Sequence, residues 1–356
     1  MPFVIVRNDI VNMQVDAIVN TANPRPVVGT GVDSAIHKKA GPGLLEARKK
    51  IGAISRGEVA VTPAFGLDAR YVIHAVGPVW QDGTHGEEQL LRQCFDNALK
   101  VAVERGCESI AFPLLSAGNY MFPEALALQI AINAFSAFLM EYEMLIYLVV
   151  FDRDAFELSE KIVHGVESYI DEHYIAEKTL DEYRLNDDWD DRFLELRRCE
   201  TRWMESFRDR EEPEEAPSIC YSLKASAPKE EWLSLENLLA ETDAGFSETL
   251  LKLIDKTGKK DSEIYKKANV DRKLFSKIRN NPGYKPSKVT AVAFALALEL
   301  NLEETQDFIG RAGYALSHSS KFDIIIEYFI LQKNYNVLEI DAVLFHYDQP
   351  TIGSEA

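Results

Sequence analysis

Apolar and polar positions alternate with two different periods over residues 1–170. Short apolar runs of strand length alternate with longer stretches in which apolar residues recur at helical spacing. The strand-like runs are Phe3–Val6, Ala17–Val19, Val59–Val61, Tyr71–Val76, Ser109–Leu115 and Met144–Phe151, and the helical stretches are Val32–Ala40, Glu87–Glu104, Pro123–Tyr142 and Asp154–Ile170. This order predicts an α/β fold in which helices cover both faces of a mixed, mostly parallel sheet. Such sheets bind ligands at the carboxyl ends of their strands.

The pattern changes twice further along the chain. Residues 173–245 are rich in charge, with helical spacing over Arg192–Arg208, and they predict an acidic helical connector and linker. Residues 246–350 predict an all-α domain of short helices separated by turns rich in Gly, Asn, Asp and Pro. Its helices are expected at Phe246–Thr257, Ser262–Ala268, Arg272–Asn280, Pro286–Leu300, Leu302–Arg311, Phe322–Leu331 and Val337–Phe345. With a first domain over residues 1–172, the chain therefore has three predicted segments.

Composition narrows the class of protein. The net charge of −18 is uneven, because residues 171–245 hold 22 acidic against 10 basic side chains, while residues 246–356 hold 15 of each. The four cysteines are scattered and no histidine pair has ligand spacing, so neither a disulfide framework nor a metal site is expected. We see no signal peptide and no run of about 18 apolar residues, so we expect a cytoplasmic protein without a membrane partner.

Three loops of the first domain combine residue types suited to a phosphate-containing ligand. Asp9–Ile10 follows the first strand, and Asn20–Asn23 ends the second before Gly29–His37 leads through a glycine loop into a helix. Pro113–Pro123 leaves a later strand through a second loop that contains glycine. Backbone N–H groups in such loops approach phosphates closely, and the helix dipole favours their negative charge. Two loops of this kind suit a diphosphate that lies between them.

Other side chains in these loops extend the same hypothesis. The Asp9 carboxylate suits the exocyclic amine of adenine, and the ring of Tyr120 or Phe122 suits a sugar or a base. Asp33 and His37 are four residues apart, so they share one face of the helix. Taken singly, each residue also fits an ordinary structural role, as a helix-terminal charge, a half-buried histidine or a core ring.

Together, these motifs resemble the macro-domain family, and the spacing of Asn23, Asp33 and His37 resembles its MacroD-type hydrolase branch. The resemblance implies that Asp33 orients or activates water at the anomeric carbon, with support from His37, while Asn23 binds the distal ribose. It implies ADP-ribose as the ligand, without a cofactor, and an ADP-ribosylated protein or O-acyl-ADP-ribose as the substrate. The implied ligand-binding residues are Asp9, Ile10, Asn20, Gly29, Thr30, Gly31, Val32, Ser116, Ala117, Gly118, Asn119, Tyr120 and Phe122.

One residue departs from the family's pattern and keeps a second interpretation open. Thr30 interrupts a glycine run that is usually continuous, and a β-branched residue resists positive φ and narrows the channel beside the distal ribose. If Thr30 blocks the chemistry, the domain is a reader that binds ADP-ribose without turnover. Otherwise it is a hydrolase of ADP-ribose conjugates.

The last domain contains a local basic helix. Asn269 occupies a predicted left-handed turn and Asp271 a predicted N-cap, while Leu274 and Ile278 form the expected inner stripe. This stretch resembles a phage-repressor helix-turn-helix, which implies DNA as a partner, whereas a packing or assembly module is the alternative. The last helices are expected to cover an exposed face or to form a homodimer. The side chains that point outward, as candidates for DNA contacts, are Arg272, Lys273, Ser276, Lys277 and Arg279.

Overall fold

The computed structural model describes residues 2–151, 166–170 and 244–353. Met1–Ile170 and Ala244–Ala356 form one compact unit. The predicted acidic connector and most of the predicted helix Asp154–Ile170 lie outside the described residues, although residues 166–170 are helical. The predicted division into domains therefore stays a prediction.

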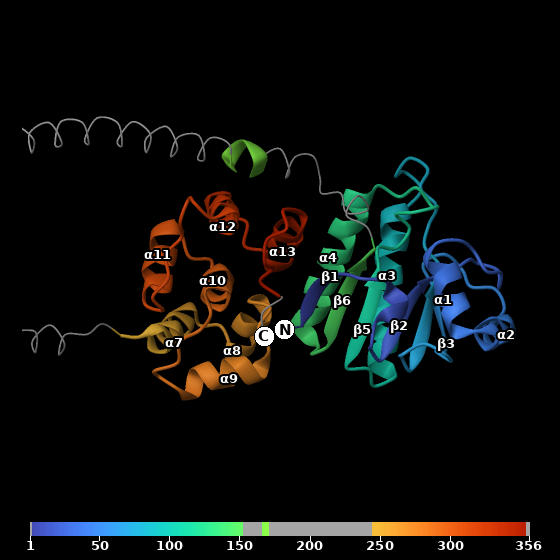
Figure 1. The fold of residues 1–356 in the computed structure, drawn as a ribbon, viewed down its shortest axis with the longest axis horizontal. Coiled ribbons are helices and arrows are strands. Elements are labelled where there is room, and N and C mark those ends of the chain that lie inside the picture. Colours follow the sequence, from blue (N-terminus) through green and yellow to red (C-terminus); the bar gives the residue numbers. More distant parts are fainter. Residues whose placement is uncertain (1, 152–165, 171–243, 354–356) are drawn as a thin grey trace, which may run out of the picture. The chain divides into compact units, whose positions relative to one another are not determined.

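Six strands form one sheet in the order β1-β6-β5-β2-β4-β3 (Figure 1). Neighbouring strands are parallel except β3 and β4, which pair antiparallel, so the predicted mixed, mostly parallel sheet is confirmed. Its two edge strands are β1 and β3. The strands are β1 Phe3–Arg7, β2 Ala17–Thr21, β3 Val59–Pro63, β4 Tyr71–Ala75, β5 Ser109–Pro113 and β6 Leu145–Val150.

Helices cover both faces of the sheet, as the alternation of side chains along β2 shows. Ala17 and Val19 pack in the cluster that contains α3 Glu87–Glu104 and α4 Glu124–Glu141. Ile18 points to the other face and packs with α1 Val32–Ala40 and α2 Pro42–Ile51. Helix α2 was not predicted, although Pro42 at its first turn is a common helix start. The three-layer α/β/α arrangement follows from this packing.

Helix α4 is apolar around most of its circumference, and by length and composition alone it resembles a membrane span. Its packing explains the pattern. One side meets α3, with Phe135 in contact with Phe95 and Phe112, and other positions meet α8 Asp261–Lys267 and α13 Val337–His346 of the helical region. A helix with protein on two sides needs little polar surface.

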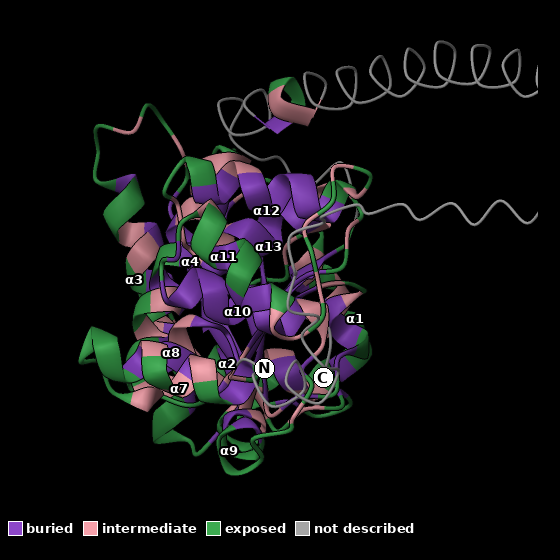
Figure 2. Cartoon of the chain, turned by 90° about the vertical axis from the view of Figure 1, so that its left-hand side faces the viewer, coloured by how far each residue is buried: buried purple, intermediate pink, exposed green. Residues whose placement is uncertain are grey.

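The C-terminal residues form a helical region built around α10. Its residues Val289–Ala297 are all buried, and Figure 2 shows α10 surrounded by other helices. Each helix predicted in this region is present, with ends within three residues of the prediction. The helices are α7 Phe246–Thr257, α8 Asp261–Lys267, α9 Arg272–Asn280, α10 Lys288–Ala297, α11 Leu302–Gly310, α12 Lys321–Leu331 and α13 Val337–His346.

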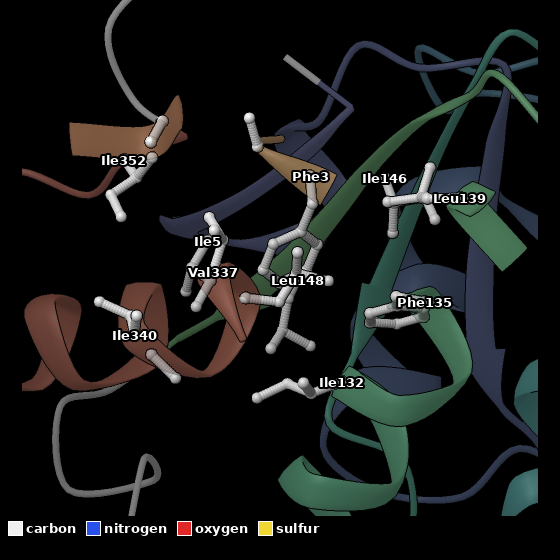
Figure 3. Packing of buried hydrophobic residues seen from close by; sticks show 14 of the residues in the cluster. Phe3, Ile5, Ile132, Phe135, Leu139, Ile146, Leu148, Val337, Ile340 and Ile352 are labelled. Carbon is white, nitrogen blue, oxygen red and sulfur yellow. The ribbon is translucent and has the colours of Figure 1, made fainter. Parts of the chain in front are cut away.

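The helical region covers the outer edge of the sheet. Side chains of α13, including Val337 and Ile340, pack in the same cluster as Phe3 and Ile5 of β1 (Figure 3). The buried Asn269 side chain donates to the Phe3 carbonyl and accepts from the Phe3 N–H, each at 2.9 Å. An amide that pairs with both backbone groups replaces a neighbouring strand there and blocks edge-to-edge association.

Candidate functional site

A cavity of about 530 Å³ lies where β2, β4 and β5 end. Its position is the one expected for a ligand site in a parallel sheet, and its size suits a small organic ligand. Ten of the residues predicted from the sequence line it, together with Thr21, Ala22, Ala75, Gly77, Leu114 and Leu115. These ten are Asn23, Gly29, Thr30, Gly31, Val32, Asp33, Ser116, Gly118, Asn119 and Tyr120.

The glycine loop meets the start of α1 inside this cavity. Gly31 is the N-cap of α1 and has a φ of 61°, a conformation that few other residues adopt. Thr30 has no positive φ, so the strain expected at that position is absent and Gly31 takes the unusual conformation instead. A Cβ on Gly29 would lie 2.9 Å from Nδ2 of Asn23, which shows how closely this loop packs. The positive end of the α1 dipole therefore faces the cavity.

Asp33 lies on the first turn of α1 with only 3% of its surface exposed. Its Oδ1 accepts from Nδ2 of Asn20 at 2.6 Å, and its Oδ2 accepts from the N–H of Gly29 at 2.5 Å. Burial alone would raise the pKa of Asp33, but hydrogen bonds from His37, Gly29 and Asn20 outweigh it and hold the pKa below the ordinary value. The group is thus a fixed carboxylate and a weak proton acceptor.

His37 supports this carboxylate from the next turn of α1. Its Nδ1 lies 2.9 Å from the Asp33 backbone carbonyl and 3.3 Å from Oδ1 of Asp33. The hydrogen bond to the Asp33 side chain is the main reason that the pKa of His37 is raised. His37 does not line the cavity, whereas the Asp33 carboxylate that it contacts does.

A second histidine completes the set of polar groups behind the cavity. On paired strands, Asn20 of β2 lies opposite His74 of β4, and Nδ2 of Asn20 is 3.2 Å from Nδ1 of His74. The other ring nitrogen lies 3.0 Å from Oγ1 of Thr62 on β3. Burial, with the nearby charges of Arg48 and His37, lowers the pKa of His74 to about 3 and keeps the ring neutral.

The neutral ring fixes the direction of these hydrogen bonds. Because Asn20 uses Nδ2 as a donor, Nδ1 of His74 is the acceptor and its Nε2 donates to Thr62. One amide group of Asn20 therefore serves both His74 and Asp33. The sequence analysis missed His74 and Thr62, because their role depends on strand pairing, although a histidine inside an apolar strand was a visible signal.

The second loop faces the first across the cavity. Ser116 has a φ of 64°, and its hydroxyl is buried without a hydrogen-bond partner among the described residues. The loop is held by bonds from the Trp80 N–H to the Tyr120 carbonyl and from the Phe122 N–H to the Ser116 carbonyl, at 2.8 and 3.1 Å. An unusual backbone conformation that leaves a buried hydroxyl unsatisfied is typical of a ligand site.

Asn23 joins the two loops. Its Nδ2 donates to the Val27 carbonyl at 3.2 Å, and its Oδ1 accepts from the Tyr120 hydroxyl at 3.4 Å. The buried guanidinium of Arg48 donates to the backbone carbonyls of Asn23 and Pro24 at 3.1 and 3.3 Å. Arg48, which the sequence analysis also missed, thus fixes the segment that carries Asn23.

Other predicted site residues lie elsewhere. Phe122 is 1% exposed and packs edge-on against Trp80 in the core, so its assignment as a ligand-facing ring is wrong. Asp9 caps the short 3₁₀ helix η1 Ile10–Asn12 by accepting from the Val11 N–H at 3.1 Å. Asp9, Ile10 and Ala117 do not line the cavity, and Asn20 lies behind Asp33. The adenine contact of Asp9 stays a prediction.

A larger cavity of about 800 Å³ lies between α4, α8 and the start of α13. Two of its cations already have partners, since Lys266 donates to the Met140 carbonyl at 3.0 Å and Lys267 pairs with Glu299. The smaller cavity combines a buried carboxylate, an unsatisfied hydroxyl and a helix N-terminus. We therefore place the candidate site there, despite its smaller volume.

Asp82, His85 and Glu87 form the cluster of potential metal ligands in the described part of the chain. Their acceptors are occupied, because Glu87 accepts from the N–H groups of Gln81, Gly83 and His85. The cluster thus shapes the loop before α3.

The basic helix of the C-terminal region has the predicted local features. Asn269 has a φ of 55°, and Asp271 caps α9 by accepting from the Leu274 N–H at 2.8 Å. Of the predicted inner stripe, Ile278 is buried and the half-buried Leu274 packs against the core, while the buried Phe275 was not predicted. The five candidate DNA contacts Arg272, Lys273, Ser276, Lys277 and Arg279 are all exposed.

Comparisons with known proteins find similarity over the first part of the chain. The family model described as Macro domain matches residues 19–131. A macro domain-containing protein of Chlorobaculum tepidum is 45% identical over 152 residues, which are 42% of this chain and 88% of that protein. The O-acetyl-ADP-ribose deacetylase of Escherichia fergusonii is 44% identical over 165 residues, which are 45% of this chain and 93% of that protein. A solved structure, the Oceanobacillus iheyensis macrodomain with ADP, is 37% identical with a TM-score of 0.42, and covers 46% of this chain and 91% of that one.

Proposed function

This chain belongs to the macro domain family, and we propose that its first 170 residues bind ADP-ribose and hydrolyse ADP-ribose conjugates. The substrate class is carboxylate-linked ADP-ribose on proteins or O-acyl-ADP-ribose. A relative at 44% identity is named an O-acetyl-ADP-ribose deacetylase, which supports this class. The observation that carries the proposal is the buried Asp33 carboxylate in the wall of a cavity between two glycine loops.

Binding rests on the polar groups around that cavity. The diphosphate would lie between the α1 N-terminus at Gly31 and the second loop, where the Ser116 hydroxyl has no hydrogen-bond partner in the described part of the chain. The distal ribose would contact Asn23 and Tyr120, which already contact each other. Such contacts would bring the anomeric carbon close to Asp33. Asp9 would bind the adenine amine, as the family resemblance implies.

The protonation state of Asp33 decides its chemical role. Because the pKa of Asp33 is held below its ordinary value, the carboxylate is a poor general base at neutral pH. It instead orients the attacking water and stabilises the positive charge that develops at the anomeric carbon. The water oxygen then bonds to that carbon as the bond to the leaving carboxylate breaks, and the proton of water passes to solvent.

Turnover of two substrates by the full chain tests this proposal. The substrates are O-acetyl-ADP-ribose and a protein mono-ADP-ribosylated on glutamate, with calorimetry of free ADP-ribose as the binding measurement. We expect binding and release of product from at least one substrate. Binding without turnover on either would instead support the alternative, a reader of ADP-ribose.

A second candidate function concerns α9. Five polar side chains of α9 are exposed, and the helical region that contains them has a balanced overall charge. They are Arg272, Lys273, Ser276, Lys277 and Arg279. Lys277 lies over the ring of Tyr284, and Arg279 pairs with Asp261, so part of the charge is already engaged. We propose DNA as the partner of this face. A salt-dependent DNA shift that is lost in Lys273→Glu/Lys277→Glu would support it, and no shift at low salt would argue against it.

A further inference from the structure

Two exposed side chains connect the loops on either side of the cavity. Nδ2 of Asn119 in the second loop lies 2.5 Å from Oγ1 of Thr30 in the first loop, although the two residues are 89 positions apart in the chain. Both residues line the cavity and both are exposed. We call this contact the Thr30–Asn119 bridge.

The bridge lies on the solvent side of the candidate site. Asp33 and Ser116 line the same cavity but are only 3% and 8% exposed, so they form its deeper part. The bond from the Tyr120 hydroxyl to Oδ1 of Asn23 is a second link between the loops. Thr30 and Asn119 therefore lie at the exposed rim of the cavity, with Asp33 and Ser116 deeper inside it.

Neither loop needs the bridge to keep its shape. In the first loop, Gly31 and not Thr30 has the positive φ. In the second loop, backbone bonds from Met121 to Gly118 and from Phe122 to Ser116 close the turn without Asn119. Because water competes for an exposed hydrogen bond, this one is weak enough to open and close. A weak, exposed contact that neither loop needs for its own shape is suited to control the access of a ligand to the cavity.

We propose that the Thr30–Asn119 bridge closes over bound ADP-ribose and selects conjugates with small leaving groups, such as O-acyl-ADP-ribose, over conjugates with proteins. This inference rests on the function proposed above. A short acyl group fits under the closed bridge, whereas a protein attached at the distal ribose has to leave the cavity between Thr30 and Asn119. The bridge then has to open for the whole catalytic cycle.

Three single variants of the full chain test the bridge. Thr30→Val replaces the hydroxyl by a methyl group of the same shape, Asn119→Ala removes the donor, and Thr30→Ser keeps the hydroxyl. The probe is etheno-ADP-ribose, whose association and dissociation rates are followed by stopped-flow fluorescence. The second readout is the ratio of kcat/KM for O-acetyl-ADP-ribose to kcat/KM for a glutamate-linked ADP-ribosyl protein.

We expect Thr30→Val and Asn119→Ala each to raise both exchange rates about three- to tenfold, the effect of losing one side-chain hydrogen bond, and to lower the kcat/KM ratio by a similar factor. Thr30→Ser keeps the hydroxyl that accepts from Asn119, so it should change the exchange rates and the kcat/KM ratio less than Thr30→Val does. The double variant Thr30→Val/Asn119→Ala should add little, because either change alone already breaks the same bond.

The outcomes separate the bridge from the function on which it rests. Unchanged exchange rates and an unchanged ratio in Thr30→Val and Asn119→Ala would overturn the bridge while leaving ADP-ribose binding intact. Faster exchange with an unchanged ratio would overturn the selection of small leaving groups. If the wild type fails to bind the probe, the proposed function itself is wrong.

Discussion

The side-chain amide of Asn20 lies 2.6 Å from Oδ1 of Asp33 and thereby connects the candidate catalytic carboxylate to the sheet beneath it. The same nitrogen lies 3.2 Å from His74, whose ring contacts Thr62 on the next strand. Asp33 itself is on α1. The position of one carboxylate thus depends on a helix, a glycine loop and three paired strands.

Removal of His74 tests whether this network positions Asp33. In His74→Phe, the Asn20 amide loses an acceptor and is free to rotate away from Asp33. We expect kcat to fall about tenfold, as for a lost positioning contact, while the Kd for ADP-ribose changes less than about threefold. The exposed His85→Phe is the matched control for a histidine outside the site. A parallel loss of binding in His74→Phe would instead indicate a purely structural role.

The close packing of the first loop gives a second prediction. A Cβ at Gly29 would lie 2.9 Å from Nδ2 of Asn23 and 3.3 Å from Oδ2 of Asp33. We therefore expect Gly29→Ala to displace one or both side chains and to lower kcat/KM about a hundredfold, the usual cost of a displaced reacting group. Gly310→Ala is the control, because nothing lies within 4 Å of a Cβ there. Wild-type kcat/KM in Gly29→Ala would show that Asn23 and Asp33 tolerate movement.

The pKa values of Asp33 and His37 shift in opposite directions, and this gives a pH dependence of stability. The lowered pKa of Asp33 stabilises the fold above the ordinary value of 3.8, and this contribution is lost as the pH falls through the lowered pKa. The raised pKa of His37 stabilises the fold below the ordinary value of 6.5, and this contribution is lost as the pH rises through the raised pKa.

Urea unfolding of the wild type and of His37→Gln at several pH values shows whether the stabilisation by His37 decreases as the pH rises. We expect the difference in unfolding free energy between them to be largest at about pH 5 and to shrink by about pH 9, because only protonated His37 pairs with Asp33. His318→Gln, at a half-exposed histidine that pairs with Glu327 outside the site, is the comparison. A difference that stays constant from pH 5 to pH 9 would mean that His37 stabilises by packing alone.

The edge of the sheet provides a prediction about stability. Asn269 is buried, has a φ of 55° and bonds both backbone groups of Phe3. Asn269→Gly keeps the turn but leaves the Phe3 groups unpaired, so we expect a loss of about 2–4 kcal/mol, the cost of two buried unsatisfied groups. Chemical denaturation measures it, with Asn334→Gly as the control, because Asn334 is only half-buried and its Oδ1 accepts a single bond, from the Asn336 N–H. A loss below about 0.5 kcal/mol would show that water replaces the Asn269 amide.

The sequence was sufficient for most elements of the fold, α2 excepted, and for the two loops. Strands and helices are set by local apolar periodicity, and the motifs of Asn23, Asp33 and Ser116 follow strand ends, so both can be read without tertiary contacts. The roles of His74 and Arg48 could not be read from the sequence. His74 acts through the pairing of β2 with β4, and Arg48 lies on α2, which was not predicted. Phe122 was misassigned because alternation around a tight turn does not show which ring faces inward.

The same limit applies to Asn269. Its left-handed turn was predictable from residue type, yet its second role as the partner of Phe3 depends on two residues 266 positions apart. Thr30 is the reverse case, since its departure from the glycine run was visible in the sequence but its hydrogen bond to Asn119 was not. Local chemistry is therefore readable from the sequence, whereas contacts between distant segments need the structure.

The most direct test of the central claim is hydrolysis by Asp33→Ala compared with the wild type, measured with O-acetyl-ADP-ribose and with a glutamate-linked ADP-ribosyl protein. Because Asp33 orients the water and the loops bind the diphosphate, we expect turnover of both substrates to fall at least about a hundredfold. Calorimetry should still detect ADP-ribose binding to the variant. Turnover within about threefold of the wild type would contradict the account.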